Sequence, residues 1–146
     1  MEITTNSPIE TEEVGRRLAL HLVNENKIPA FISLYGEMGV GKTAFVRGFC
    51  SALNTSGVKS PTYTIVNEYR RGDFPVFHFD MYRVESEDDL ISIGFYDYLA
   101  QKGFCLCEWS ENITEFIPDD ALTVTIARTQ GSEEQRIITL KEIDVL

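Results

Sequence analysis

The sequence predicts an α/β fold in which one mixed sheet has parallel strands at its centre, antiparallel strands at its edges and helices on both faces. The first reason is the stretch 30–54, where a short apolar run, a glycine-rich turn and a helical pattern follow one another. The second is that strand-like runs alternate with helical segments along the rest of the chain. The 146 residues show no repeat or linker, so residues 1–146 are expected to form a single domain.

The N-terminal part of the chain predicts a short strand and an amphipathic helix. Residues 2–5 are expected to form an edge strand. The helix is expected to begin at Ser7, with Pro8 at its first position and Glu10 completing a capping box. Apolar residues then recur at helical spacing to about Asn24, so one face of this helix should be buried.

The remaining elements are expected to follow in a definite order. They are a strand at 30–35, a helix from 42 to about 53, strands at 65–69 and 75–79 joined by a tight turn, a helix that Ser86 caps, a helical segment at 95–102, and strands at 104–108, 122–128 and 135–140. The strands at 65–69 and 75–79 should pair as an antiparallel hairpin.

Cys105 and Cys107 lie two residues apart on the strand expected at 104–108, so their side chains share one face. The cysteine count of three is odd and argues against a disulfide framework. No second pair of Cys or His at suitable spacing completes a metal site. Buried thiols of the core are therefore expected.

The formal net charge of −10 restricts the partners of this chain. Nucleic-acid binding depends on Lys and Arg contacts with phosphates, so independent binding of RNA or DNA is not expected. No apolar run approaches the roughly 20 residues that span a bilayer. The N-terminus also lacks the basic and apolar regions of a secretory signal. A cytoplasmic protein without membrane association is expected.

The glycine-rich turn fits the P-loop pattern G-x-x-x-x-G-K-[ST], with Gly36 at its start and Gly41, Lys42 and Thr43 at its end. Glycines let successive backbone N–H groups curve around a phosphate, and the following helix directs its positive end at the same anion. Lys42 would reach the terminal phosphates, and the Thr43 hydroxyl would bind Mg²⁺. A chance glycine turn is the alternative, but the flanking strand and helix favour a P-loop NTPase domain.

Two acids at the ends of expected strands are candidates for the rest of the site. Asp80 follows the strand at 75–79, and Glu108 ends the strand at 104–108. Mg²⁺ prefers oxygen ligands and keeps several waters, so Thr43 with one or two carboxylates and phosphate oxygens would suffice. Each acid could instead cap a turn or pair with Arg83.

Three classes of nucleotide-binding protein remain open at this point. An ATPase needs only the P-loop and the strand-end acids. A small-molecule kinase shares the P-loop, but no lid insertion that carries arginines is visible. A binding module in which the nucleotide only sets the conformation predicts partner binding without turnover. Guanine selection is unsupported, because neither N-K-x-D nor D-x-x-G occurs.

Four motifs stand in this order along the chain: G-E-M-G-V-G-K-T at 36–43, S-P-T-Y-T at 60–64, H-F-D-M-Y-R at 78–83 and E-W at 108–109. Together they resemble one family, the bacterial ATPases of tRNA threonylcarbamoyladenosine biosynthesis known as TsaE. The family's loop G-D-L-G-A-G-K-T is changed here, but an acid, an apolar residue and all three glycines are kept. The last twenty residues match no motif.

The resemblance implies an ATPase that binds and hydrolyses Mg-ATP to assemble or reset a complex. Its partners would be a transferase subunit and the inactive paralogue of that subunit, and the chain itself would not transfer the threonylcarbamoyl group. Little direct tRNA binding and no DNA binding are therefore expected, in agreement with the acidic charge. The residues expected to hold ATP are Gly36, Gly39, Val40, Gly41, Lys42, Thr43 and Ala44. Lys42, Asp80 and Glu108 would be catalytic, and Thr43, Glu108 and Asp80 would hold Mg²⁺.

The resemblance also marks a switch segment that would sense the γ-phosphate or a partner. Its expected residues are Ser60, Thr62, Thr64 and Trp109. An ordinary proline turn and simple packing of the indole are the alternatives. His78 is expected to be an oriented structural residue. The start of the first helix and the strand near Arg128 are possible walls of an adenine pocket.

Overall fold

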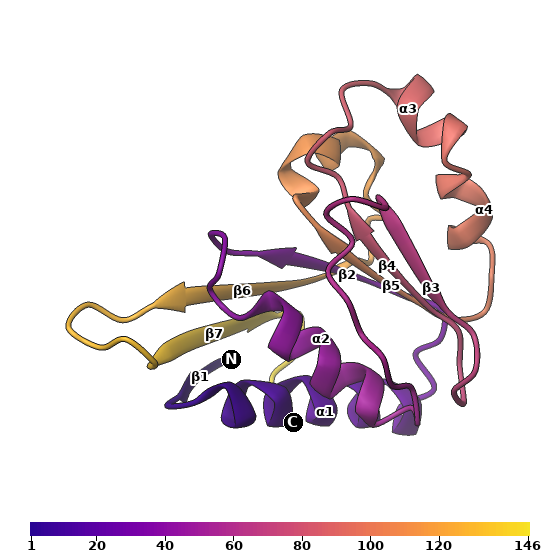
Figure 1. The fold of residues 1–146 in the computed structure, drawn as a ribbon. Coiled ribbons are helices and arrows are strands. Elements are labelled where there is room, and N and C mark those ends of the chain that lie inside the picture. Colours follow the sequence, from indigo (N-terminus) through magenta and orange to yellow (C-terminus); the bar gives the residue numbers. More distant parts are fainter.

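The computed structural model describes residues 1–146. Its elements in chain order are β1 (Glu2–Thr5), α1 (Pro8–Asn24), β2 (Ala30–Tyr35), α2 (Lys42–Ser51), β3 (Val66–Tyr69), β4 (Val76–Asp80), α3 (Glu87–Ser92), α4 (Phe95–Leu99), β5 (Phe104–Glu108), the 3₁₀ helix η1 (Ser110–Phe116), β6 (Leu122–Arg128) and β7 (Arg136–Lys141). All strands join one seven-stranded sheet with the order β1-β7-β6-β2-β5-β4-β3 (Figure 1).

The centre of the sheet is parallel and its edges are antiparallel. β2 lies between β5 and β6 and pairs with both in parallel, and β4 extends the parallel part beyond β5. On one side, β7 pairs antiparallel with β6 and with β1. On the other side, β3 pairs antiparallel with β4 to form the expected hairpin. The predicted α/β class and mixed sheet are confirmed.

Helices cover both faces of the sheet, as predicted (Figure 1). On one face, α1 and α2 bury an apolar cluster against β2, β5, β6 and β7, with Leu18, Leu22, Phe45 and Phe49 fully buried. On the other face, α3, α4 and η1 cover a smaller cluster that is built around phenylalanines of β2 and β4. Because successive strand residues point to opposite faces, one short strand supplies both clusters.

Helices α1 and α2 pack closely because glycines stand at their contact. A Cβ atom at Gly48 would lie 1.8 Å from the carbonyl oxygen of Glu12, and one at Gly15 would lie 2.1 Å from that of Phe45. Both contacts are with backbone, which cannot rotate away. These glycines therefore set the position of α2, and with it the position of the P-loop that α2 follows.

Several predicted boundaries and caps differ from the structure. Ser7 caps α1 as expected by accepting the Glu10 N–H at 3.2 Å, but the Glu10 carboxylate accepts the N–H of Asn6, one residue before the cap. Ser86 is the N-cap residue of α3, as predicted, but its side chain makes no capping hydrogen bond. The helical segment expected at 95–102 ends earlier, with α4 (Phe95–Leu99), and η1 was not anticipated.

The cysteines are buried thiols, as predicted, and no disulfide forms. Cys105 and Cys107 share the face of β5 that α3 and α4 cover. Burial raises the pKa of Cys50 and of Cys105 to about 12 and raises the pKa of Cys107 further still. These thiols are therefore protonated in the folded protein at neutral pH. None of the helices has the length and apolar character to cross a membrane.

Candidate functional site

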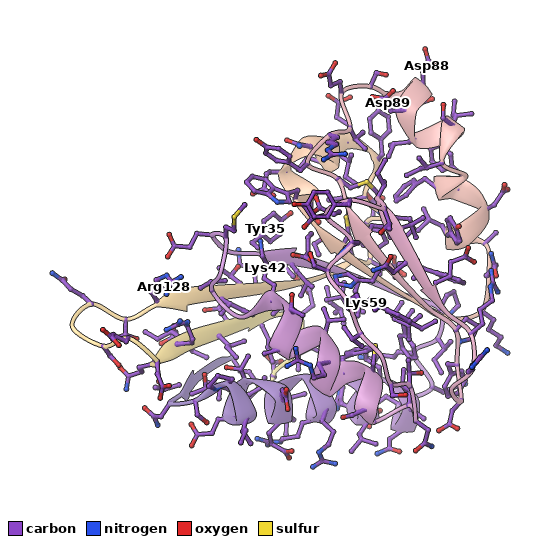
Figure 2. The ribbon with its side chains drawn as sticks, in the orientation of Figure 1. Tyr35, Lys42, Lys59, Asp88, Asp89 and Arg128 are labelled. Atoms are coloured by element: carbon purple, nitrogen blue, oxygen red, sulfur yellow. The ribbon has the colours of Figure 1, made fainter.

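The P-loop connects the end of β2 to the start of α2 at the carboxyl edge of the parallel strands. Gly41 stands just before α2 with φ of +119°, a conformation that side chains other than glycine rarely adopt. Gly36 has φ of +149°, and a Cβ atom there would lie 2.6 Å from the Ile126 carbonyl oxygen. Figure 2 labels Lys42 where α2 begins and Arg128 where β6 ends.

The two candidate acids end neighbouring parallel strands. Asp80 on β4 stands opposite Glu108 on β5, and Glu108 also stands opposite Leu34 on β2. Alternation along β4 and β5 directs both acids to the face that α2 covers, because Val76 and Leu106, at even spacing from them, belong to the core under α1 and α2. Parallel pairing of β4 and β5 thus places Asp80 beside Glu108, although the two acids are 28 positions apart in the sequence. Both lie on the same face of the sheet as α2, which carries Lys42.

Lys42 is buried among these groups, with 8% of its surface exposed. Its Nζ donates a hydrogen bond to the Gly36 carbonyl oxygen at 2.7 Å and lies 3.8 Å from Oε1 of Glu108. It also lies 5.5 Å from the centre of the Trp109 ring, within the range of a cation–π contact. A buried ammonium that has one carboxylate and one carbonyl beside it still has donor capacity for an anion.

The Glu108 carboxylate is held from two sides, and 7% of the residue is exposed. Its Oε2 lies 2.6 Å from Nε2 of His78, which is fully buried. Its Oε1 faces Lys42. The imidazole of His78 is therefore oriented by its contact with Glu108 on the neighbouring strand.

Asp80 is 5% exposed and caps the turn after β4, where its Oδ1 accepts the Tyr82 N–H at 2.9 Å. The alternative in which Asp80 pairs with Arg83 is wrong. The Arg83 guanidinium instead lies over the Tyr63 ring, 6.0 Å from its centre. Capping leaves Oδ2 of Asp80 without a hydrogen-bond partner in the protein, so this oxygen can accept from, or bind, another group.

One cavity of about 720 Å³ gathers most of the predicted residues, and it is called the P-loop cavity below. Its lining consists of Glu37, Met38, Gly39, Gly41, Lys42, Thr43, Ser60, Thr62, Tyr63, Asp80, Tyr82, Arg83, Glu108 and Trp109. Gly36, Val40, Ala44 and Thr64 were also predicted, but they do not line this cavity. The Gly36 carbonyl oxygen nevertheless accepts a hydrogen bond from Lys42, which does line the cavity.

Trp109 begins the segment after β5 in a strained conformation. Its φ of +58° is uncommon for a bulky residue. The indole contacts the Tyr82 ring, with centres 4.8 Å apart, and packs partly against the cluster under α3 and α4. Trp109 therefore packs against its neighbours and also lines the cavity, so simple packing of the indole does not exclude contact with a bound nucleotide.

The segment 60–64 forms one wall of the P-loop cavity, with its hydroxyls in two different places. Ser60 and Thr62 line the cavity and their hydroxyl oxygens lie 2.7 Å apart. Thr64 donates instead to Asn67 Oδ1 at 2.6 Å. The segment ends at Ile65, whose φ of +70° is strained for a β-branched residue. The Ile65 carbonyl accepts the Asp80 N–H at 2.8 Å, which links the segment directly to β4.

Two arginines brace the P-loop from its outer side. The sequence pointed to the strand near Arg128 only as a possible wall of an adenine pocket, and it gave no signal for Arg136. Arg128 on β6 donates to Glu37 Oε1 at 2.6 Å and to the Gly39 carbonyl at 3.1 Å. Arg136 on β7 donates from Nε to the Val40 carbonyl at 2.8 Å. The carbonyls of Gly39 and Val40 are therefore held on this side, while the Val40 N–H donates within the loop to the Glu37 carbonyl at 3.3 Å. No local pattern signals these contacts, since the partners are some 90 residues apart.

A second cavity of about 370 Å³ adjoins the P-loop. Its lining consists of Pro8, Thr11, Gly39, Val40, Gly41, Ala44, Glu133, Glu134 and Arg136. The start of α1 forms one wall of this cavity, and the turn before β7 with Arg136 forms the opposite wall. Val40 and Ala44, which do not line the P-loop cavity, lie here. That an adenine base binds beside α1 or Arg128 stays a prediction.

No group of three or more His, Cys, Asp or Glu side chains forms a metal site by itself. The oxygen donors that line the P-loop cavity are the Thr43 hydroxyl and the carboxylates of Asp80 and Glu108. One hydroxyl and two carboxylates suit Mg²⁺, which binds proteins through few oxygens and takes the rest from phosphate and water. The residues present therefore fit a magnesium ion that arrives with a nucleotide.

Comparison with known proteins identifies the family. The family model described as "Threonylcarbamoyl adenosine biosynthesis protein TsaE" matches residues 5–138. The tRNA threonylcarbamoyladenosine biosynthesis protein TsaE of Bacillus subtilis is 37% identical over 134 residues, which cover 91% of this chain and 80% of that protein. The protein of the same name from Haemophilus influenzae is 36% identical over 116 residues, which cover 77% of this chain and 72% of that protein.

A solved structure agrees with this assignment. The crystal structure of Bacillus subtilis YdiB is similar to this chain with a TM-score of 0.76 at 30% identity, covering 96% of this chain and 83% of that one. The similarity therefore extends over the sheet, the P-loop and the C-terminal strands together. The chain belongs to the TsaE family of threonylcarbamoyl adenosine biosynthesis proteins.

Proposed function

We propose that this chain is a P-loop ATPase required for forming the threonylcarbamoyl group on the tRNA adenosine next to the anticodon. It binds and hydrolyses Mg-ATP to assemble or reset a complex with a transferase subunit and the inactive paralogue of that subunit. The names of the relatives support the place in tRNA modification. The single observation that carries the ATPase proposal is that Lys42, Thr43, Asp80 and Glu108 line one cavity.

The phosphates are proposed to lie along the P-loop with the terminal one beside Lys42. The loop's N–H groups and the N-terminus of α2 supply partial positive charge, and Lys42 supplies a full charge. About 720 Å³ is within the usual range of small-molecule sites. Gly39 and Gly41 line both cavities, so a nucleotide can extend from one into the other, with the base proposed to occupy the smaller one.

Magnesium is proposed to be held by the Thr43 hydroxyl and Glu108, with Asp80 nearby. A bound Mg²⁺ neutralises charge that develops on the phosphate oxygens. Hydrolysis breaks the bond between the γ-phosphorus and the bridging oxygen while a water attacks in line. Asp80 is proposed to orient this water through Oδ2, since Oδ1 is used by the Tyr82 N–H.

The segment 60–64 is proposed to sense the γ-phosphate. Support comes from the hydroxyls of Ser60 and Thr62 in the cavity wall, and from the strained Ile65 that joins the segment to Asp80. Strained residues at the end of a loop are typical of segments with two arrangements. Thr64, which bonds Asn67, would anchor the segment, and Trp109 would close the cavity beside Lys42.

Partner binding is proposed to occur over the mouth of the P-loop cavity. Three of its lining side chains are apolar or aromatic and largely exposed, namely Met38, Tyr63 and Tyr82. Exposed aromatic residues of this kind are typical of interfaces. A net charge of −10 favours a protein partner over tRNA as the surface that this chain grips.

The proposal is tested by measuring ATP binding, phosphate release and pull-down of the two partner proteins. Wild type is compared with Lys42→Ala and with Arg47→Ala, which removes the same charge from an exposed position on α2. We expect partner-dependent phosphate release that Lys42→Ala abolishes and Arg47→Ala leaves within about twofold. Unchanged hydrolysis in Lys42→Ala would contradict the site.

The same experiment separates the other two classes of protein. A phosphorylated metabolite that appears with ADP in place of inorganic phosphate would indicate a small-molecule kinase. Partner capture that depends on ATP, without any release of phosphate, would indicate a binding module. Either result would overturn the proposal of an ATPase and leave the membership of the family intact.

A further inference from the structure

We propose that His78 is a positioning residue that holds the Glu108 carboxylate in the orientation required to bind Mg²⁺. This inference rests on the proposed function of the P-loop cavity. His78 does not line that cavity and has no exposed surface, so it cannot touch a nucleotide. It acts through Glu108.

The strand register produces this contact. His78 stands opposite Leu106 on the neighbouring parallel strand, and Glu108 is two residues further along. Residues i and j+2 on adjacent strands share a face, and a long side chain can bridge that diagonal. The result is a distance of 2.6 Å between Nε2 of His78 and Oε2 of Glu108.

The surroundings decide which nitrogen carries the proton. An ionised carboxylate only accepts hydrogen bonds, so the short contact requires an N–H at Nε2. Nδ1 is buried and has no hydrogen-bond partner, and an N–H there would be left without an acceptor. The geometry therefore places an N–H at Nε2, which donates to Oε2 of Glu108.

Because of this bond, the two carboxylate oxygens of Glu108 have different partners. Oε2 is occupied by His78, while Oε1 faces Lys42 at 3.8 Å, too far for a hydrogen bond. Without His78 the carboxylate is free to rotate toward Lys42 and to close an ion pair with it. That movement would withdraw an oxygen from the metal and the ammonium from the phosphate. His78 thus keeps the acid and the lysine apart.

The test uses the purified chain and the fluorescence of Trp109, the sole tryptophan, which lies beside Lys42 in the cavity. ATP is titrated without magnesium, and Mg²⁺ is then titrated at fixed ATP. The variants are His78→Leu, which removes the donor, and His78→Gln, whose amide can donate at a similar reach. Thermal unfolding shows whether each variant is folded.

We expect His78→Leu to raise the Mg²⁺ midpoint about tenfold, the usual effect of losing a partner behind a metal ligand. Its affinity for ATP without magnesium should change less than about twofold, because the phosphate contacts of the loop remain, and His78→Gln should restore most of the Mg²⁺ response. An unchanged Mg²⁺ midpoint in His78→Leu would overturn the inference. So would equal losses with and without magnesium, or a His78→Gln variant as weak as His78→Leu.

A measurement on the unmodified protein keeps the inference testable if the variants do not fold. The chain has two histidines, so ¹⁵N-labelled imidazole signals can be assigned with one substitution at His21. We expect a proton on Nε2 of His78, and an Nε2 that carries no proton would overturn the inference. Glu108→Ala separates the two proposals. If Glu108→Ala shifts the Mg²⁺ midpoint and His78→Leu does not, the proposed role of His78 is wrong while the proposed metal site stands. If Glu108→Ala has no effect, the proposed metal site itself fails.

Discussion

Replacing Lys42 by methionine should change the stability of the fold as well as its ability to bind ATP. Methionine keeps the length of the side chain and removes its charge. The lysine and Glu108 side chains are 8% and 9% exposed, and their charged atoms are 3.8 Å apart. At an effective dielectric constant of about 20, a pair at this distance attracts by roughly 4 kcal/mol. The variant loses this attraction and leaves a buried carboxylate with one partner, His78.

The net loss should be smaller than the attraction itself. The P-loop cavity admits water next to both groups, which weakens the pair, and methionine adds apolar contacts in place of the stem of lysine. The Gly36 carbonyl also loses its hydrogen bond from Nζ, worth about 1 kcal/mol. We expect the free energy of unfolding to fall by about 2 kcal/mol and the melting temperature to fall by roughly 6 °C.

The assay is urea unfolding without nucleotide, followed by circular dichroism, in a double-mutant cycle with Glu108→Gln. The glutamine keeps the shape of the acid but not its charge, so the double variant should be more stable than the sum of the single changes by about 1–2 kcal/mol. Additive effects would refute the reasoning, because they would mean that the two charges do not interact. An unfolding midpoint of Lys42→Met equal to that of the wild type would refute it as well.

Three further predictions concern the loop, the helices and the thiols. Arg136→Ala should weaken ATP binding about fivefold in a fluorescence titration because the Val40 carbonyl loses its donor, whereas Arg47→Ala should not; equal effects would contradict the bracing role. Gly48→Ala should lower the free energy of unfolding by about 2–3 kcal/mol, since its Cβ would meet the backbone of Glu12 at 1.8 Å, and an unchanged urea midpoint would contradict this. The raised pKa values of the three buried cysteines mean that the folded state keeps protons that the unfolded state releases; stability from this source is present below pH 9 and is lost as the pH rises from about 9 to about 12. Thiol labelling of the folded protein at pH 8 should therefore be no faster than unfolding, and rapid labelling without denaturant would disprove the burial.

Much of the fold could be predicted because its signals are local. Short runs rich in apolar residues mark most strands, Ser7 and Pro8 mark the start of α1, and the polar stretch at 70–73 marks the turn between β3 and β4. The errors also have local causes. Ser86 has the residue type of a cap but does not make the bond, and η1 has no periodic pattern of its own.

The candidate site was partly predictable for a different reason. Lys42 and Thr43 belong to one continuous motif, whereas Asp80 and Glu108 could be chosen because the carboxyl ends of parallel strands meet at one edge of a sheet. Arg128 and Arg136 could not be chosen this way. Their guanidinium groups contact the P-loop from strands near the C-terminus, and nothing in the surrounding sequence reports that contact.

The family, the glycine-rich loop and the two candidate acids could be recognised from the chain alone, because each depends on residue types at short spacing or at the end of a strand. How these groups are held is visible only in the folded protein, where His78 contacts Glu108, Ile65 contacts Asp80, and the arginines of the last two strands contact the loop. Such contacts depend on strand order and register. These are set by the packing of the whole sheet and not by any one segment.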